Sequence, residues 1–240
     1  MKAALIFLNG FYDIRHLDFY RQEISFAIKN GNPLICADGG IRIFDKLNQQ
    51  ESKTLIPDIL IGDLDSIDGK TTEAKRTVEK WIGQTDKDYT DGQLAVDYAL
   101  KHYDSQHIII YGGLPRPEEY EIDHFLGNLK LMRFGHYLAS DKYTDFKAEM
   151  RAPRQTIHYV LSELRLTRKN SGLQRVSLIA YEANVIVESS QNLRWDLTSL
   201  HIHPDLTNAL RNEFIEGAAW AEIQLTENSA PVYVIHNWYD

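Results

Sequence analysis

The sequence has a single cysteine, no excess of basic residues and no long apolar run. One cysteine excludes an intrachain disulfide and a thiolate-rich metal site. This residue, Cys36, lies in an apolar run, so we interpret it as a small buried hydrophobe rather than a nucleophile. A net charge of −8 offers no basic surface to nucleic acid or to an anionic membrane.

The longest apolar stretches are also too short to cross a bilayer, and the run at residues 3–8 is too short for a signal peptide. We therefore expect a cytoplasmic protein. Its 240 residues are enough for one large domain or two small ones, and its 43% hydrophobic and 25% charged residues are typical of globular proteins.

Three common motifs of α/β enzymes are missing. Six residues separate Gly62 from Gly69, whereas a P-loop has four residues between its glycines. No Gly-x-Gly-x-x-Gly follows the first predicted strand, which argues against a dinucleotide site. No Gly-x-Ser-x-Gly occurs either, which removes the commonest hydrolase built on such a sheet.

Hydrophobic periodicity predicts an α/β domain over residues 1–150, in which short apolar runs alternate with amphipathic segments. This alternation implies crossover connections, hence a Rossmann-like, mostly parallel sheet with flanking helices. Thr90 and Gln93 fit a capping box at the start of the fourth helix. The expected strands are 3–8, 34–37, 58–61, 108–111 and 137–140, and the expected helices are 18–29, 41–47, 70–81, 91–103 and 122–134.

The pattern changes near residues 151–154, beyond which the apolar runs are short and rich in β-forming residues. This composition predicts a second domain over residues 155–240, an all-β sandwich or barrel. Its expected strands are 156–161, 176–180, 184–188, 193–197, 219–226 and 232–236.

Two aspartates follow the third predicted strand directly. Asp63 and Asp65 are two residues apart, so in extended chain their carboxylates point to the same side. Two neighbouring carboxylates repel each other unless they share a cation or a proton, and Mg2+ prefers such hard oxygen ligands. The alternative is an acidic, solvated turn without a ligand.

A second acidic loop lies just before the fourth predicted helix and contains Asp86, Lys87, Asp88 and Asp91. Acidic residues at a helix start are stabilised by the macrodipole, which explains Asp88 or Asp91 singly but not the whole group. Lys87 is suited to contact a phosphate as a point charge. The two loops together indicate a metal–phosphate site.

Weaker motifs follow other predicted strands or begin helices, and each has a plain structural alternative. A lone Asp-Gly turn is usually only a turn, and a His beside an Asp is more often a structural pair than a catalytic one. His201 and His203 lack a further metal ligand nearby in the sequence, so we do not interpret them as a metal site. The other motifs are Asp38-Gly39-Gly40, Gly112-Gly113 and Asp123-His124.

In this order and spacing, the motifs resemble those of thiamine pyrophosphokinases across most of the first 130 residues. Residues 193–197 and 212–214 are similar to two segments of that family's small C-terminal β-sandwich. The resemblance implies transfer of a pyrophosphoryl group from ATP to thiamine, with Mg2+ on the triphosphate. It also implies a homodimer that binds thiamine where the catalytic domain of one subunit meets the β-domain of the other.

The resemblance also assigns roles to residues. It places Mg2+ on Asp63, Asp65 and Asp88, and it places Asp38, Asp91 and Asp123 on the remaining acidic rim of the catalytic site. Either Asp38 or Asp91 would orient or deprotonate the thiamine hydroxyl. Trp195 and Asn212 would help to form the thiamine pocket. The ATP-binding residues would be Gly39, Gly40, Ser66, Lys87, Thr90, Gly112, Gly113, Arg116 and His124.

The sequence departs from the family pattern at a few positions. Glu121 stands where an arginine is expected, and Arg116 in the preceding insertion is a candidate to replace it. Asn192 occupies a position where glycine is usual, and Arg211 one where serine is usual. Two alternatives therefore stay open: a diphosphokinase acting on another heterocyclic alcohol such as a pterin, and a catalytically degenerate regulator that binds ATP or thiamine.

Overall fold

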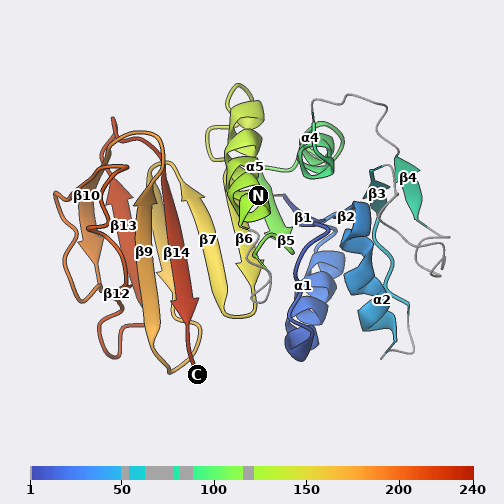
Figure 1. The fold of residues 1–240 in the computed structure, drawn as a ribbon, viewed down its shortest axis with the longest axis horizontal. Helices are drawn as coiled ribbons and strands as arrows, with labels where there is room; N and C mark the ends of the chain where they lie inside the picture. Colours follow the sequence, from blue (N-terminus) through green and yellow to red (C-terminus); the bar gives the residue numbers. More distant parts are fainter. Residues whose placement is uncertain (1, 50–53, 63–77, 82–88, 116–121) are drawn as a thin grey trace. The chain divides into compact units, whose positions relative to one another are not determined.

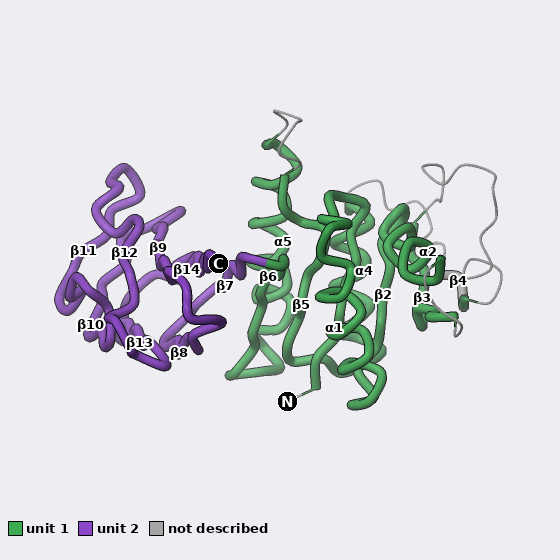
Figure 2. The backbone as a smooth tube through the Cα atoms, turned by 90° about the horizontal axis from the view of Figure 1, so that it is seen from below, with its two compact units in different colours: residues 1–153 green, residues 154–240 purple. Residues whose placement is uncertain are grey.

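The computed structural model describes residues 2–49, 54–62, 78–81, 89–115 and 122–240, and for 79–81 only the backbone is described (Figure 1). The described residues fall into two compact units, Met1–Pro153 and Arg154–Asp240 (Figure 2). No helix in the described part of the chain combines the length and the hydropathy that a membrane span requires.

Unit 1 contains a parallel sheet, in which every pair of neighbouring strands runs in the same direction. The spatial order is β6-β5-β1-β2-β3-β4, so the first strand lies in the interior and the chain extends the sheet first on one side and then on the other. The strands are β1 Ala3–Phe7, β2 Leu34–Ala37, β3 Ile59–Ile61, β4 Glu79–Trp81, β5 His107–Tyr111 and β6 Lys147–Ala152.

Helices cover both faces of this sheet. Because side chains alternate along a strand, Leu5 and Phe7 of β1 pack with α1 and α2 on one face. On the other face, α4 contacts β1 and β2, while α5 contacts α4 and β6. The helices are α1 Leu17–Lys29, α2 Arg42–Asn48, α4 Asp91–His102 and α5 Asp123–Ala139, and two 3-10 turns span Ile14–His16 and Asp38–Ile41.

Several predictions for unit 1 are confirmed. The predicted α/β class with a parallel sheet is correct, and four strands and four helices lie within a few residues of their expected bounds. Thr90 and Gln93 form the expected capping box, with the Gln93 amide N–H 3.3 Å from Thr90 Oγ1 and the Thr90 amide N–H donating to Gln93 Oε1 at 2.9 Å. Cys36 is fully buried, and burial raises the pKa of its thiol well above the usual value.

Two predictions for unit 1 are wrong. The run 137–140 is not a strand, because residues 137–139 continue helix α5, where Ala139 is buried and Tyr137 is exposed. The end of the helix predicted over 70–81 is wrong, because Glu79–Trp81 form strand β4; residues 70–77 lie outside the described residues.

Strand β6 was not predicted because its sequence is charged. Glu149 and Arg151 lie in this strand and are held in an ion-pair network. Glu149 Oε1 lies 2.7 Å from His107 Nε2 and 2.6 Å from Arg151 Nη2, while Arg151 Nη1 lies 2.6 Å from Glu23 Oε2. The Tyr111 hydroxyl also donates to Glu23. Because these buried charges are paired, a strand can form here although its sequence is polar.

Unit 2 consists of antiparallel strands in two sets, β12-β9-β14-β7 and β11-β10-β13-β8. Apolar residues from both sets, such as Val176 and Val234 from one and Val187 and Ile223 from the other, share one core. The strands are β7 Gln155–Val160, β8 Glu163–Thr167, β9 Gln174–Ala180, β10 Val185–Gln191, β11 His201–Ile202, β12 Asn212–Glu213, β13 Trp220–Leu225 and β14 Val232–Trp238.

The all-β character of unit 2 agrees with the prediction, but its details differ. Residues 193–197 do not form a strand, since they contribute only one isolated bridge, Leu193 to Phe214. Strands β8, β11 and β12 were not predicted. Two of these are only two residues long, which leaves no alternation to recognise.

A buried histidine, His236, makes the stability of unit 2 depend on pH. His236 is 1% exposed, stacks on Phe214 and lies 3.0 Å from Gln174 Oε1 through Nε2. Burial lowers its pKa from 6.5 to about 3. Below pH 6.5 the unfolded chain binds a proton that the folded protein does not, so this stability contribution is complete above pH 6.5 and is lost as the pH falls toward 3.

We predict that His236→Gln removes the part of the pH dependence of stability that the titration of this histidine causes. The free energy of unfolding of the wild type should fall by up to about 1.4 kcal/mol per pH unit more steeply than that of the variant between pH 6 and pH 3. Urea titrations across that range measure it. His201→Gln, at an exposed position of the same unit, is the matched control. Identical slopes for wild type and His236→Gln would contradict the prediction.

Candidate active site

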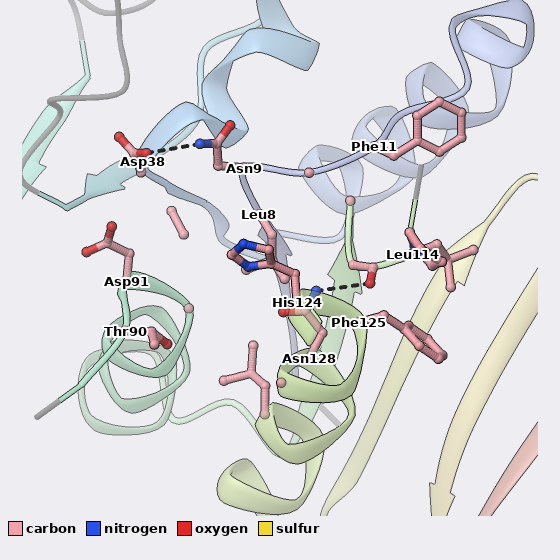
Figure 3. Close-up of a pocket in the computed structure, with 18 of the residues that line it drawn as sticks. Leu8, Asn9, Phe11, Asp38, Thr90, Asp91, Leu114, His124, Phe125 and Asn128 are labelled. Atoms are coloured by element: carbon pink, nitrogen blue, oxygen red, sulfur yellow. Dashed lines mark hydrogen bonds between the residues drawn. The ribbon is translucent and has the colours of Figure 1, made fainter. Parts of the chain in front are cut away.

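A cavity of about 720 Å³ lies at the carboxyl edge of the parallel sheet (Figure 3). Strand β1 pairs with both β2 and β5, so the connections leaving it and its neighbours diverge at this point. Open parallel sheets bind ligands at such a switch point, and the volume suits a small molecule. The lining comes from the residues after β1 (8–11), β2 (37–38) and β5 (112–115) and from the first turns of α4 and α5.

Asp38 lines this cavity with an unfavourable backbone conformation and a buried carboxylate. Its backbone has a φ of 46°, the left-handed region that non-glycine residues seldom adopt. The side chain is only 6% exposed, and Oδ1 has no hydrogen-bond partner among the described residues. Only glycine fits at position 40, two residues later, because a Cβ there would lie 1.9 Å from the Phe7 carbonyl oxygen. A left-handed backbone and a buried carboxylate oxygen without a partner among the described residues together make Asp38 a candidate functional residue.

Asp91 approaches Asp38 from the other side of Gly62. A Cβ built on Gly62 would lie 3.1 Å from the Asp91 carboxyl carbon and 3.3 Å from the Asp38 Cβ, so Gly62 separates the two side chains. Asp91 is the first residue of α4, where the helix dipole favours a negative charge. Figure 3 shows both carboxylates at one end of the cavity.

The opposite wall is held by two hydrogen-bonded side chains that sequence analysis did not assign to the site. The Tyr12 hydroxyl donates to the Leu8 carbonyl at 2.8 Å, and Asn128 Nδ2 donates to the Gly113 carbonyl at 3.0 Å. Burial raises the pKa of Tyr12 well above its usual value, so its hydroxyl keeps its proton and remains a donor. Backbones also touch here, because a Cβ on Gly10 would lie 1.9 Å from the Gly112 carbonyl oxygen.

The remaining side chains divide the cavity by polarity. In Figure 3 the His124 ring projects into its middle from the start of α5. Phe11, Leu114 and Phe125 lie together at the end away from Asp38 and Asp91 (Figure 3). One end therefore offers carboxylates and the other an apolar surface, as a ligand with a polyphosphate–metal part and a flat ring would require.

The structure brings together most of the predicted site residues that it describes. Asp38, Thr90, Asp91, Gly112, Gly113, Asp123 and His124 line the cavity, and Gly39 and Gly40 continue from Asp38. Asp63, Asp65, Ser66, Lys87, Asp88 and Arg116 lie outside the described residues, and so does Glu121.

A metal at this site would depend on residues of the acidic loops. Within the described ranges, no group of three or more His, Cys, Asp or Glu side chains is arranged to hold a metal ion. Asp38 and Asp91 fit such an ion nonetheless, because Asp38 Oδ1 has no partner among the described residues, the two side chains lie on either side of Gly62, and both carboxylates are hard oxygen ligands.

In unit 2, Trp195 presents its ring at the surface and Asn212 shapes the backbone behind it. Trp195 is 52% exposed, with the Arg194 guanidinium 4.9 Å from its ring centroid. Asn212 is 3% exposed, accepts from the Trp195 amide at 3.1 Å and donates to the Trp195 carbonyl at 2.7 Å. Asn212 therefore holds Trp195 in place rather than projecting into solvent.

The unusual residues near Trp195 have a conformational explanation. Asn192 has a φ of 59°, a left-handed conformation that glycine adopts freely and asparagine tolerates better than most residues. The position thus keeps the backbone that a glycine would allow. Arg211 is also left-handed, with a φ of 60°, and its amide donates to Ser177 Oγ at 2.9 Å.

Fold and site together define an α/β protein whose ligand cavity lies at the switch point of a parallel sheet. Residues 26–139 match the family model "Thiamin pyrophosphokinase, catalytic domain". This part of the chain, which includes Asp38, Asp91 and Asp123, is similar to the catalytic domain of that family. No curated protein sequence matches the chain.

Solved structures show the same fold over both units. The thiamine pyrophosphokinase of Bacillus subtilis is 21% identical, with a TM-score of 0.72 and all of both chains covered. The thiamin pyrophosphokinase of Candida albicans is 14% identical, with a TM-score of 0.74, covering 99% of this chain and 89% of the other. The yeast enzyme is 17% identical, with a TM-score of 0.71 and coverages of 99% and 86%.

We predict that Asp38→Asn stabilises the protein while lowering its kcat by about 100- to 10,000-fold. The substitution removes a buried charge, one oxygen of which has no partner among the described residues, and keeps a side chain that tolerates the left-handed backbone, so the free energy of unfolding should rise by about 1 kcal/mol. Thermal and urea unfolding measure this. Asp97→Asn, which breaks an exposed pair with Lys101 on α4, is the control and should change little. A less stable Asp38→Asn variant would show that this carboxylate is structural.

Proposed function

We propose that the protein transfers the pyrophosphoryl group of ATP to the hydroxyethyl oxygen of thiamine, forming thiamine diphosphate and AMP. The observation that carries the proposal is the family match over residues 26–139, because this segment supplies the carboxylates that line the cavity. In the reaction, the thiamine oxygen bonds to the β-phosphorus, the bond to the oxygen of the α-phosphate breaks, and the hydroxyl loses its proton.

The chain's contribution to this reaction is positioning and charge. Asp38, whose Oδ1 has no partner among the described residues, would orient the hydroxyl or accept its proton, with Asp91 on the other side of Gly62. The cavity-lining backbone of Gly112 and Gly113 leaves room for phosphates to approach closely. Mg2+, held by Asp63, Asp65 and Asp88 in this proposal, would supply the positive charge that a triphosphate needs in an acidic cavity.

ATP fits the division of the cavity by polarity. Its phosphates would lie toward Asp38 and Asp91, and its base toward Phe11, Leu114 and Phe125. Thr90 and His124 would contact the nucleotide between these ends.

Thiamine is a cation with two aromatic rings, and its proposed contact in unit 2 is the exposed face of Trp195. Asn212 would act by fixing the Trp195 backbone. We further propose a cytoplasmic homodimer, in which the site is completed by a second subunit. We also propose that unit 1 has a Rossmann-like fold and that unit 2 is a β-sandwich. These folds are supported by the strand order in unit 1 and by the core that two sets of strands share in unit 2.

The purified protein should convert thiamine and ATP into equal amounts of thiamine diphosphate and AMP when Mg2+ is present. Chromatographic separation of nucleotides and thiamine esters measures both products. Chelation of the metal should stop the reaction, and restoring Mg2+ should recover it. Binding of ATP or thiamine without AMP release would favour a regulatory protein, and AMP release only with a pterin-type alcohol would favour the related diphosphokinase.

Trp195→Ala should raise the KM for thiamine about tenfold, the range expected for loss of a cation–π contact, while the KM for ATP stays within about twofold. Trp220→Ala is a matched control, because Trp220 is a tryptophan of the same unit stacked by an arginine, Arg165, at 4.0 Å. Steady-state kinetics with each substrate varied separately measure both constants. Equal effects of the two substitutions would rule out Trp195 as the thiamine contact.

A further inference from the structure

Asn9, the second residue after β1, lies between two charged side chains at the acidic end of the cavity. Its Nδ2 donates to Asp38 Oδ2 at 3.2 Å, and its Oδ1 accepts from Arg42 Nη1 at 3.2 Å (Figure 3 shows the first contact). An ionised carboxylate can only accept hydrogen bonds, and a guanidinium can only donate them. The amide of Asn9 therefore has a single orientation that satisfies both neighbours.

The turn after β2 is built around this amide. A Cβ on Gly39 would lie 2.2 Å from Asn9 Oδ1, so the glycine next to Asp38 makes the room that the Asn9 side chain fills. The left-handed backbone of Asp38 begins the same turn. Three strand and helix segments thus meet at Asn9: the end of β1, the turn that follows β2, and the first residue of α2, Arg42.

Because of this contact, the two carboxylate oxygens of Asp38 have different surroundings. Oδ2 is held by Asn9, whereas Oδ1 is buried and has no partner within the part of the chain that the structure describes. Arg42 lies on the far side of the amide, and its charge polarises the Asn9 N–H toward Asp38. Other polar groups around Asp38 come from other elements: Asp91 of α4 across Gly62, and His124 of α5 in the cavity.

We propose that Asn9 is a positioning residue of the reaction. Its amide, fixed by Arg42, holds Oδ2 of Asp38 and so fixes the orientation of the carboxylate that acts on the substrate hydroxyl. This inference rests on the proposed function, and it adds a residue that acts through Asp38 without touching substrate.

A double-mutant cycle on kcat tests the inference. Asn9→Ala should lower kcat by about 10- to 100-fold, the range for losing a hydrogen bond to a charged group, with the KM for ATP within about threefold of wild type. In an Asp38→Ala background, Asn9→Ala should have no further effect, because the group through which it acts is gone. Arg42→Ala should lower kcat less and should likewise add nothing to Asn9→Ala. Independent, multiplying effects of Asn9→Ala and Asp38→Ala would overturn the inference.

Asn48→Ala is the control for stability. Asn48 also bridges two groups through its amide, since it donates to the Leu55 carbonyl at 2.9 Å and accepts from the Leu55 amide at 2.7 Å. It belongs to unit 1 but does not line the cavity. The control should lower the urea midpoint and leave kcat within about twofold, which separates loss of positioning from loss of stability.

A second cycle, on unfolding, does not depend on turnover. The shifts of the urea midpoint caused by Asn9→Ala and Asp38→Ala should be less than additive if the two side chains interact. Additive shifts would overturn the pairing, and less-than-additive shifts with an unchanged kcat in Asn9→Ala would overturn the positioning role. If the wild type forms no thiamine diphosphate, the proposed function fails by itself, and the unfolding cycle still decides whether Asn9 holds Asp38.

Discussion

The parallel pairing of β1 with both β2 and β5 is the constraint on which the rest of unit 1 depends. It brings three strand ends to one edge of the sheet, so residues that are about 30 and 100 positions apart in the sequence line the same cavity. Close packing at this edge requires glycine where backbones touch, as at Gly40 and Gly10. Helices α4 and α5, which lie on the same face of the sheet, then direct Asp91 and His124 into the space that remains.

The buried charges of unit 1 differ in how completely they are paired. Glu149 and Arg151 in β6 have partners on α1 and β5, and such a network holds elements together. Asp38 is buried to a similar extent, yet one of its oxygens has no partner among the described residues. A paired buried charge is compatible with a structural role, whereas an unpaired one is a cost to folding that a ligand can relieve. This difference separates the structural carboxylates from the candidate catalytic ones.

Much of the fold and the site follows from the sequence where a local signal is strong. Strand 34–37, the capping box of Thr90 and the placement of Asp38 and Gly112 at strand ends were all predictable. Strand β6 was not, because its charges are neutralised by distant residues that no local pattern reveals. Asn9 and Tyr12 were missed for a similar reason, since their roles come from contacts with Asp38 and with backbone carbonyls. The rule that led to Asp38, inspection of residues just past a strand, applied equally to Asn9 and would have found it.

The glycine contacts at the sheet edge also limit how the specificity of this protein can evolve. The floor of the cavity is backbone lying on backbone, at Gly10 against Gly112 and at Gly40 against Phe7, so no substitution there can reshape it without displacing a strand. Phe11, Leu114 and Phe125 lie at the rim, where side chains can change size at little cost to the sheet. A change in the preferred donor or acceptor would therefore be expected to arise by substitution at the rim, and a library for redesign should be confined to those positions.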